Sequence, residues 1–505
     1  MLLIYLLWLL FSGYSLTLVL ITKSDSDNDN DNDNLLLRFA ITPLLAILLP
    51  SLLIYILNIV SIKITTVSLL VPWITIIFAI AFWYRKNLIE SYQEIKGYFL
   101  SYKIFGRILL ILLSLTMLSL YVRVAISDIW VGDGMIHWGL KAHNWSYLGK
   151  ILYSPWIEKD LALWTHYPLY HSVGMLVNIV SLPLPYIHPA FAVKLFDAIY
   201  MYGIFFTSLF FLKFATEFRR SLLLIFSLAL TFGVRDIPSA MISGYADIDQ
   251  SYYIFLGCTL IAFMFFYEEK ISPSLLFILS LIFVLAMITK VDGLYRVLII
   301  IFWIFFMMVF NGGFVPKLRK LNLISIIFLL LPLLLLYLDQ ISRPLVVSSS
   351  GGQFFDEMIN DPLLIAKRIP NGIISLYYSL SSSCESIIKC SASISFVLSM
   401  VSAVYLILNP CRTYRPYGPD KLYRRRIVIF FAGIVVCNYL LNMVPVVMVN
   451  NVIDPRLNDP ITYATMGFNR YNAQLFLLNN AIIIMGIDIF FQTLHASRDN
   501  LCNNS

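Results

Sequence analysis

The chain has 505 residues, of which 59% are hydrophobic and 13% are charged. Soluble domains carry about 25% charged residues, so this composition excludes an ordinary soluble protein. The formal net charge of +7 does not indicate nucleic acid as a partner, because the basic residues lie in short loops between apolar runs.

Apolar runs of roughly 18 residues, the length that crosses a bilayer as a helix, recur along the whole chain. We therefore expect an all-α, polytopic transmembrane bundle with about 13 crossings. The first run has no basic residue before it and no cleavage site after it, so we expect a retained helix. The predicted crossings span residues 2–22, 38–62, 64–84, 108–126, 191–213, 221–236, 250–267, 272–289, 294–311, 322–338, 392–409, 427–449 and 470–493.

Clusters of Lys and Arg lie between alternate crossings, which is typical of cytoplasmic loops. These clusters are Arg85/Lys86 with Lys96, Lys103 and Arg107, then Arg219/Arg220, Lys317/Arg319/Lys320, and the basic loop 410–426. Residues 127–190, 339–391 and 450–469 then lie outside, together with the short turns 237–249 and 290–293. The apolar segment Tyr170 to Leu184 would invert every later loop if it crossed, so we expect an interfacial or re-entrant helix.

The chain divides into three predicted parts. Residues 1–107 hold three crossings and a disordered Asp/Asn loop from Ser24 to Asn34. Residues 108–493 form the core, and residues 494–505 form a cytoplasmic tail. Six cysteines without a CxxC pair do not make a disulfide framework, although Cys384 and Cys390 share an outside loop and could pair in an oxidising compartment.

The densest polar group follows the fourth crossing, in SDIWVGDGMIHWGLKAHNW, Ser127 to Trp145. In a helix that starts near Asp133, the side chains of Asp133, His137 and Lys141 fall on one face at i, i+4 and i+8. Such a helix would lie along the membrane with its polar stripe toward a protein cavity. The plainer interpretation is that Asp133 caps a helix whose tryptophans form an interfacial belt.

Four further polar groups lie in segments that the topology places outside. Each also has an interpretation without chemistry. The group could anchor the chain at the membrane interface, its acid could stabilise the start of a helix through the helix dipole, or its lysine could extend to the membrane surface. Lys290 runs against the topological charge bias, and Arg470 suits bidentate phosphate recognition. The groups are THYPLYHS with His166 and Tyr167, SGYADIDQSYY with Tyr245, Asp247 and Asp249, ITKVDG with Lys290 and Asp292, and GFNRYNAQ with Arg470 and Tyr471.

Taken in order, these motifs resemble the multi-pass glycosyltransferases of the GT-C type, over roughly residues 108–493. VGDGMIHWGLKAHNW is similar to the family's "WDAWxxWxLKAK", with Gly132 before the acid and His143 in place of the second lysine. The segments at 165–169, 244–247, 289–293 and 469–475 look like "HPxYPL", "GYADxP", "TKNEG" and "DRYLLQLLP", although Asn469 replaces the usual Asp and the final proline is missing.

The resemblance implies a GT-C-like fold, with interfacial helices in the first outside loop, and an inverting transfer from a polyprenyl-phosphate sugar. Asp133 would be the general base, with Asp128 as the second choice. Lys290 and Arg470 would bind the donor phosphate. The remaining substrate-binding candidates are His137, Lys141, His166, Tyr167, Tyr245, Asp247, Asp292 and Tyr471. A divalent metal stays open, with Asp133, His166 and Asp247 as candidate ligands.

Two other functions fit a cationic cavity with aromatic walls: a transporter or flippase of lipid-linked glycans, and an O-antigen polymerase or ligase. A transporter is expected to show inverted repeats and charges near the bilayer midplane, whereas this chain shows no repeat and gathers its charges at one side. The expected partners are the lipid-linked sugar, membrane lipids and a glycan, lipid or protein acceptor. The expected location is a bacterial inner membrane, or the endoplasmic reticulum membrane in a eukaryote.

Overall fold

The computed structural model describes residues 2–21, 31–126, 147–150, 195–232, 247–267, 272–289, 291–310, 330, 333–334, 391–408, 422–448 and 473–503. Within these ranges the chain is helical and contains no strand, which confirms the all-α class there. The elements are α1 (Leu2–Leu20), α2 (Asp31–Ile59), α3 (Thr66–Trp83), α4 (Arg85–Leu100), α5 (Ile104–Ile126), α9 (Leu195–Ala215), α10 (Arg220–Phe232), α12 (Asp247–Ile261), the π-helix η5 (Ala262–Tyr267), α13 (Pro273–Thr289), α14 (Val291–Phe310), α20 (Ser391–Leu408), α21 (Leu422–Met448) and α24 (Ala473–Asn503).

A helix is present at each predicted crossing except 322–338, most of which lies outside the described residues. Four stretches in the described part are long and apolar enough to cross a membrane: Asn34–Ile59, Thr66–Trp83, Ile248–Tyr267 and Leu475–Leu494. The pair α4 and α5, bent by 118°, would be a fifth if it counts as one span. These lengths are consistent with a membrane protein, while the number of crossings stays a prediction.

Several helices begin earlier than the hydropathy pattern predicts. Residues 31–34 of the predicted Asp/Asn loop belong to α2, and Arg424 belongs to the start of α21 instead of the loop 410–426. Asp249 lies inside α12, and Asp292 lies inside α14, where turns were predicted. Polar residues suit a first helical turn, because its N–H groups have no partner within the helix and acids there favour the helix dipole.

The turn between α2 and α3 is shaped by local hydrogen bonds. Ser61 takes a left-handed backbone conformation with φ of 58°. Thr65 then caps α3 through a capping box, in which the Ser68 N–H donates to Thr65 Oγ1 and the Thr65 N–H donates to Ser68 Oγ. These contacts fix where α3 begins.

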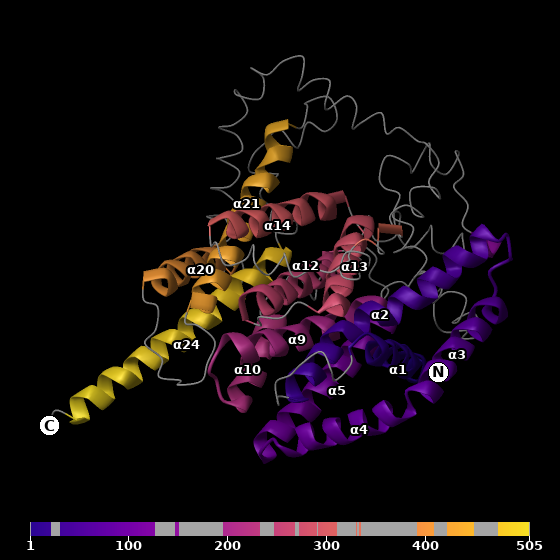
Figure 1. Cartoon of the computed structure of the whole chain (residues 1–505), viewed down its shortest axis with the longest axis horizontal. Helices are drawn as coiled ribbons and strands as arrows, with labels where there is room; N and C mark the ends of the chain where they lie inside the picture. Colours follow the sequence, from indigo (N-terminus) through magenta and orange to yellow (C-terminus); the bar gives the residue numbers. More distant parts are fainter. Residues whose placement is uncertain are drawn as a thin grey trace.

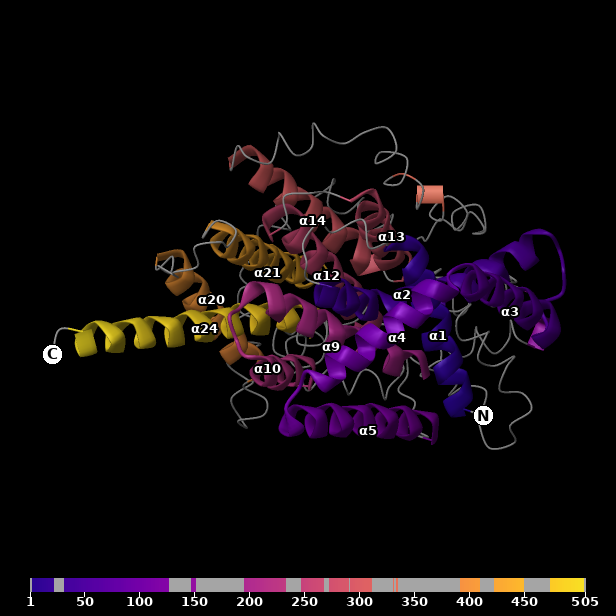
Figure 2. The same cartoon turned by 60° about the horizontal axis from the view of Figure 1, so that its bottom comes forward.

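Helix α12 lies at the centre of the bundle, where it packs against α9, α13, α14 and α24 (Figures 1 and 2). Almost all of the span Ile248–Tyr267 is buried inside the protein. Tyr252 joins α12 to the N-terminal helices, because its hydroxyl donates to the Ala40 carbonyl of α2 at 2.6 Å. The ring of Tyr252 also lies directly against Gly203 of α9, where a larger side chain would overlap it.

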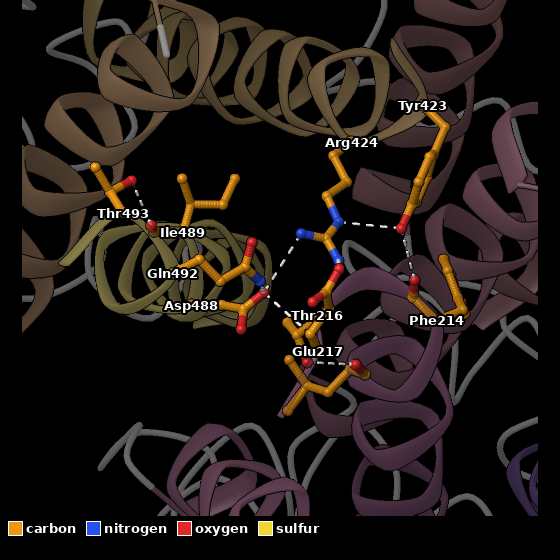
Figure 3. Close-up of polar contacts among 10 residues, drawn as sticks. Phe214, Thr216, Glu217, Tyr423, Arg424, Asp488, Ile489, Gln492 and Thr493 are labelled. Atoms are coloured by element: carbon orange, nitrogen blue, oxygen red, sulfur yellow. Dashed lines mark hydrogen bonds and ion pairs between the residues drawn. The ribbon is translucent and has the colours of Figure 1, made fainter. Parts of the chain in front are cut away.

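A partly buried ion cluster joins the end of α9 and the start of α21 to the middle of α24 (Figure 3). The Arg424 guanidinium lies 3.4 Å from Glu217 Oε1 and 3.5 Å from Asp488 Oδ2. Asp488 Oδ2 also accepts hydrogen bonds from the Glu217 backbone N–H and from Gln492 Nε2. Arg424 Nε donates to the Tyr423 hydroxyl at 3.0 Å. The cluster therefore links three helices that are far apart in the sequence.

Candidate functional site

Most of the predicted site residues lie outside the described residues. These are Asp133, His137, Lys141, His166, Tyr167, Tyr245, Lys290, Arg470 and Tyr471. Asp247 is the first residue of α12 and Asp292 the second residue of α14, but their side chains also lie outside the described part. Their predicted roles therefore stay predictions, as does the pairing of Cys384 with Cys390.

The structure brings together the helix ends that carry two of the five motifs. Helix α12 begins at Asp247 of the GYAD motif, while α13 ends and α14 begins within ITKVDG. Gln250 Nε2 of α12 donates to the Ala286 carbonyl of α13 at 3.1 Å. Gly293 of α14 lies against the same carbonyl, and a Cβ at Gly293 would lie 2.6 Å from Gln250 Nε2. The two motifs lie at the two ends of the helical hairpin formed by α12, η5 and α13, and these ends meet at one end of the bundle.

We expect Gly293→Ala to destabilise the protein, because the added methyl would overlap the Ala286 carbonyl, a backbone atom that cannot rotate away. Overpacking of this kind costs roughly 1–3 kcal/mol. Thermal unfolding of the purified protein measures the effect. Gly97→Ala is the matched control, since a Cβ at Gly97 meets nothing within 4 Å in exposed α4 and should leave the protein equally or more stable. Equal midpoints for both variants would contradict the tight contact at Gly293.

Charged and polar side chains are buried beside this junction. Asp249 is 0% exposed, Gln250 is 1% exposed and Arg296 of α14 is 2% exposed. Tyr253, one turn beyond Asp249, shares a 2.7 Å hydrogen bond between hydroxyls with Tyr200 of α9. We call Tyr200, Asp249, Gln250, Tyr253 and Arg296 the outer polar cluster, because all five lie within two turns of helix ends that the predicted topology places outside. Charged groups inside an apolar bundle are costly, and they mark functional sites more often than other positions do.

The outer polar cluster combines groups that recognise phosphates and hydroxyls. A guanidinium offers a fork of donors to phosphate oxygens, and a carboxylate accepts from hydroxyls. Gln250 Oε1 is buried and accepts no hydrogen bond from the described residues. On α14, Asp292 and Arg296 stand at i and i+4, on the same face of the helix.

Sequence reasoning missed Arg296 and Gln250, and it treated Asp249 only as part of a turn. The signal for Arg296 was present, because one cation stands inside the apolar run from Leu294 to Phe310. When basic residues are counted to predict topology, such a residue is taken as the end of a crossing. A charge that lies one turn inside an apolar helix instead suggests a functional role.

The first outside segment also contacts the helical bundle. Gly149 has φ of 68° and its carbonyl accepts a 2.6 Å hydrogen bond from the Ile64 N–H in the turn before α3. A Cβ at Gly149 would lie within 3.0 Å of Lys63 and Ile64 atoms, so the backbones approach closely. Because parity places the α2–α3 turn and the segment 127–190 on the same side, this contact agrees with the predicted topology.

Helix α24 begins at Ala473, within the last two residues of the fifth motif, and packs against α12. Its outer end is fixed to α20, because Ser399 donates to Asn479 Oδ1 at 2.8 Å and Ser395 donates to Asn480 Oδ1 at 2.9 Å. The helices that follow the third, fourth and fifth motifs therefore all belong to one packed group.

Among the described residues, no group of three or more His, Cys, Asp or Glu side chains could hold a metal ion. The predicted metal candidates Asp133, His166 and Asp247 have side chains outside that part. Comparisons of the chain with protein-family models, with curated proteins and with solved structures find no match.

Proposed function

We propose that this chain is a multi-pass membrane glycosyltransferase of the GT-C type. It moves a sugar from a polyprenyl-phosphate donor to an acceptor on the non-cytoplasmic side, with inversion at the anomeric carbon. In this proposal about 13 helices cross the membrane, and residues 108–493 form the catalytic core.

The observation that carries the proposal is the outer polar cluster beside the junction of α12, α13 and α14. Asp249 and Arg296 are buried near the helix ends that carry two of the family-like motifs. Lipid-phosphate transfer needs such a place, because the leaving phosphate requires cationic stabilisation away from water. The hydroxyl that attacks requires a carboxylate within hydrogen-bond reach.

The roles proposed for individual residues follow the family-like motifs. Asp133 removes the proton from the acceptor hydroxyl as it attacks the anomeric carbon. Lys290 and Arg470 bind the donor phosphate and stabilise the charge that grows on it as the bond to the sugar breaks. Arg296 lies six residues after Lys290 on the same helical hairpin and would add positive charge behind it.

We expect Lys290→Ala to weaken donor binding more than it slows a bound complex, because a lysine acts as a point charge on phosphate in both states. A charge-assisted contact of this kind contributes about 1.5–3 kcal/mol, which is roughly a 10- to 100-fold loss of affinity. Binding of a polyprenyl-phosphate sugar to purified protein measures it, and Lys63→Ala, at an exposed lysine in the α2–α3 turn, is the control. Unchanged donor affinity in Lys290→Ala would remove this residue from the site.

A flippase of lipid-linked glycans is the second candidate, favoured by the burial of Asp249 and Arg296 within the bundle. The two functions differ in product. Purified protein incubated with a polyprenyl-phosphate sugar and an acceptor should release free polyprenyl phosphate and a glycosylated product. A protein that moves the intact donor between leaflets of a vesicle, and releases no polyprenyl phosphate, would instead be a transporter.

A further inference from the structure

Helix α4 exposes an unusual set of side chains. It occupies a segment between two apolar helices and lies along the lower edge of the molecule in Figure 1, coming to the front in Figure 2. One exposed stripe mixes cations with apolar and aromatic groups along successive turns: Arg85, Ile89, Tyr92, Lys96 and Phe99. Ile89 is 61% exposed and Tyr92 is 66% exposed.

The acids of α4 lie on the side of the helix that faces the protein. Glu90 and Glu94 are only partly exposed, and Glu94 pairs at 3.5 Å with Arg38, a buried residue of α2. Arg38 also contacts Ser91 and donates to the Ile21 carbonyl at the end of α1. A helix facing water would expose its acids and bury its apolar groups. Here the acids face the protein, while cations and apolar groups face away from it.

The α4–α5 elbow extends the same surface and is held rigidly. Arg107 Nε donates to the Tyr102 carbonyl and Arg107 Nη2 donates to the Leu100 carbonyl, which satisfies acceptors at the end of α4. The hydroxyls of Tyr98 and Tyr102 share a 2.7 Å hydrogen bond. Burial raises the pKa of Tyr102, and the Tyr98 hydroxyl and the charge of Arg220 at the start of α10 partly offset that rise. Lys103 adds a further exposed cation at the elbow.

Exposed apolar side chains continue from the elbow onto α5 and back onto the end of α3. They are Phe82, Trp83, Leu100, Ile104, Phe105, Ile108, Ile111, Leu112 and Leu115. Arg85 lies over the Phe82 ring, 5.4 Å from its centroid. A mixture of cations and apolar groups suits the boundary between phosphate headgroups and acyl chains, where long basic side chains reach the headgroups and apolar ones enter the lipid.

We propose that the exposed side of α4 and the elbow form a binding surface for anionic phospholipids of the adjacent leaflet. We name it the α4 lipid surface, with Arg85, Lys86, Lys96 and Lys103 as its cations. This proposal requires that the helices lie in a membrane, and it does not depend on the proposed glycosyltransferase activity. Positive-inside topology already assigns these cations to the cytoplasmic side. Both acids of α4 are only partly exposed, whereas the four cations of the surface are exposed, so the surface favours negative headgroups.

A photoreactive phosphatidylglycerol tests the proposal on the full chain reconstituted in phosphatidylcholine vesicles. After illumination and proteolysis, mass spectrometry should find the probe on peptides from residues 82–107. A matching phosphatidylcholine probe should label them at least about fivefold less, because even a single cation near an anionic headgroup favours contact by roughly fivefold. Equal labelling by the two probes would overturn the proposal.

The fourfold variant Arg85→Gln, Lys86→Gln, Lys96→Gln and Lys103→Gln should lose the preference for the anionic probe. The control variant removes four exposed cations elsewhere, through Lys63→Gln, Lys150→Gln, Arg219→Gln and Arg425→Gln. It should keep the preference, and its loss in both variants would overturn the proposal. The unaltered protein gives an independent check, since about 1 M salt, with a Debye length of roughly 3 Å, should abolish the preference. If the fourfold variant only dissociated an oligomer and kept the preference, the surface would join two copies of the chain instead.

Discussion

Asp133→Asn is expected to abolish sugar transfer while the protein stays folded and binds donor. An amide has nearly the size and shape of the carboxylate but cannot accept a proton at neutral pH. Loss of a positioned general base costs about 10²- to 10⁴-fold in rate. Transfer from a polyprenyl-phosphate sugar by purified protein measures the rate, and a separate binding measurement with the same donor reports the intact site.

Asp128→Asn is the matched control, because it removes an acid five residues away in the same outside segment. It should leave transfer within about threefold of the unaltered protein, since a substitution away from the chemistry has a small effect. If Asp133→Asn kept the full rate and Asp128→Asn lost it, the base would be Asp128. If both variants kept the full rate, the proposed mechanism would be wrong.

The helices could be predicted from the sequence because their signal is local. An apolar run such as 272–289 must satisfy its backbone internally in lipid, so its length predicts the helix Pro273–Thr289 almost to the residue. Hydropathy fails where the first turn is polar, and α14 therefore begins at Val291, ahead of the predicted 294. It also missed α4, a polar helix whose Ser91 and Glu94 contact the buried Arg38 of α2.

The candidate site could be predicted only as a set of motifs on one side of the membrane. The contact of Gln250 with Ala286 and Gly293 joins three helices, and no spacing rule reveals it. Arg424 was counted only as a basic residue of a cytoplasmic loop, and Arg296 was not singled out at all. What distinguishes them is burial and the position of partners, and the Glu217 partner of Arg424 lies 207 positions away in the chain. Such pairs follow from tertiary packing, which local pattern does not specify.

Arg424→Met should destabilise the protein strongly by breaking the ion cluster of Figure 3. Methionine fills a similar volume but leaves Asp488, which is buried, and Glu217, which is partly exposed, without their cation. Removing one partner of a buried ion pair costs roughly 3–5 kcal/mol, and the exposure of Glu217 places the expected loss near the lower end. The thermal unfolding midpoint of detergent-purified protein should fall by several degrees.

Arg425→Met is the control for charge and helix position, because Arg425 is the next residue of α21 and is exposed. Its effect should stay within about 0.5 kcal/mol. Adding Asp488→Asn to Arg424→Met should cost less than the sum of the two single changes, because the second change removes a charge that the first left unpaired. Equal midpoints for Arg424→Met and Arg425→Met would mean that the cluster does not hold α9, α21 and α24 together. A difference of several degrees would show that this contact stabilises the packing of α24, the helix that begins directly after the proposed phosphate-binding Arg470.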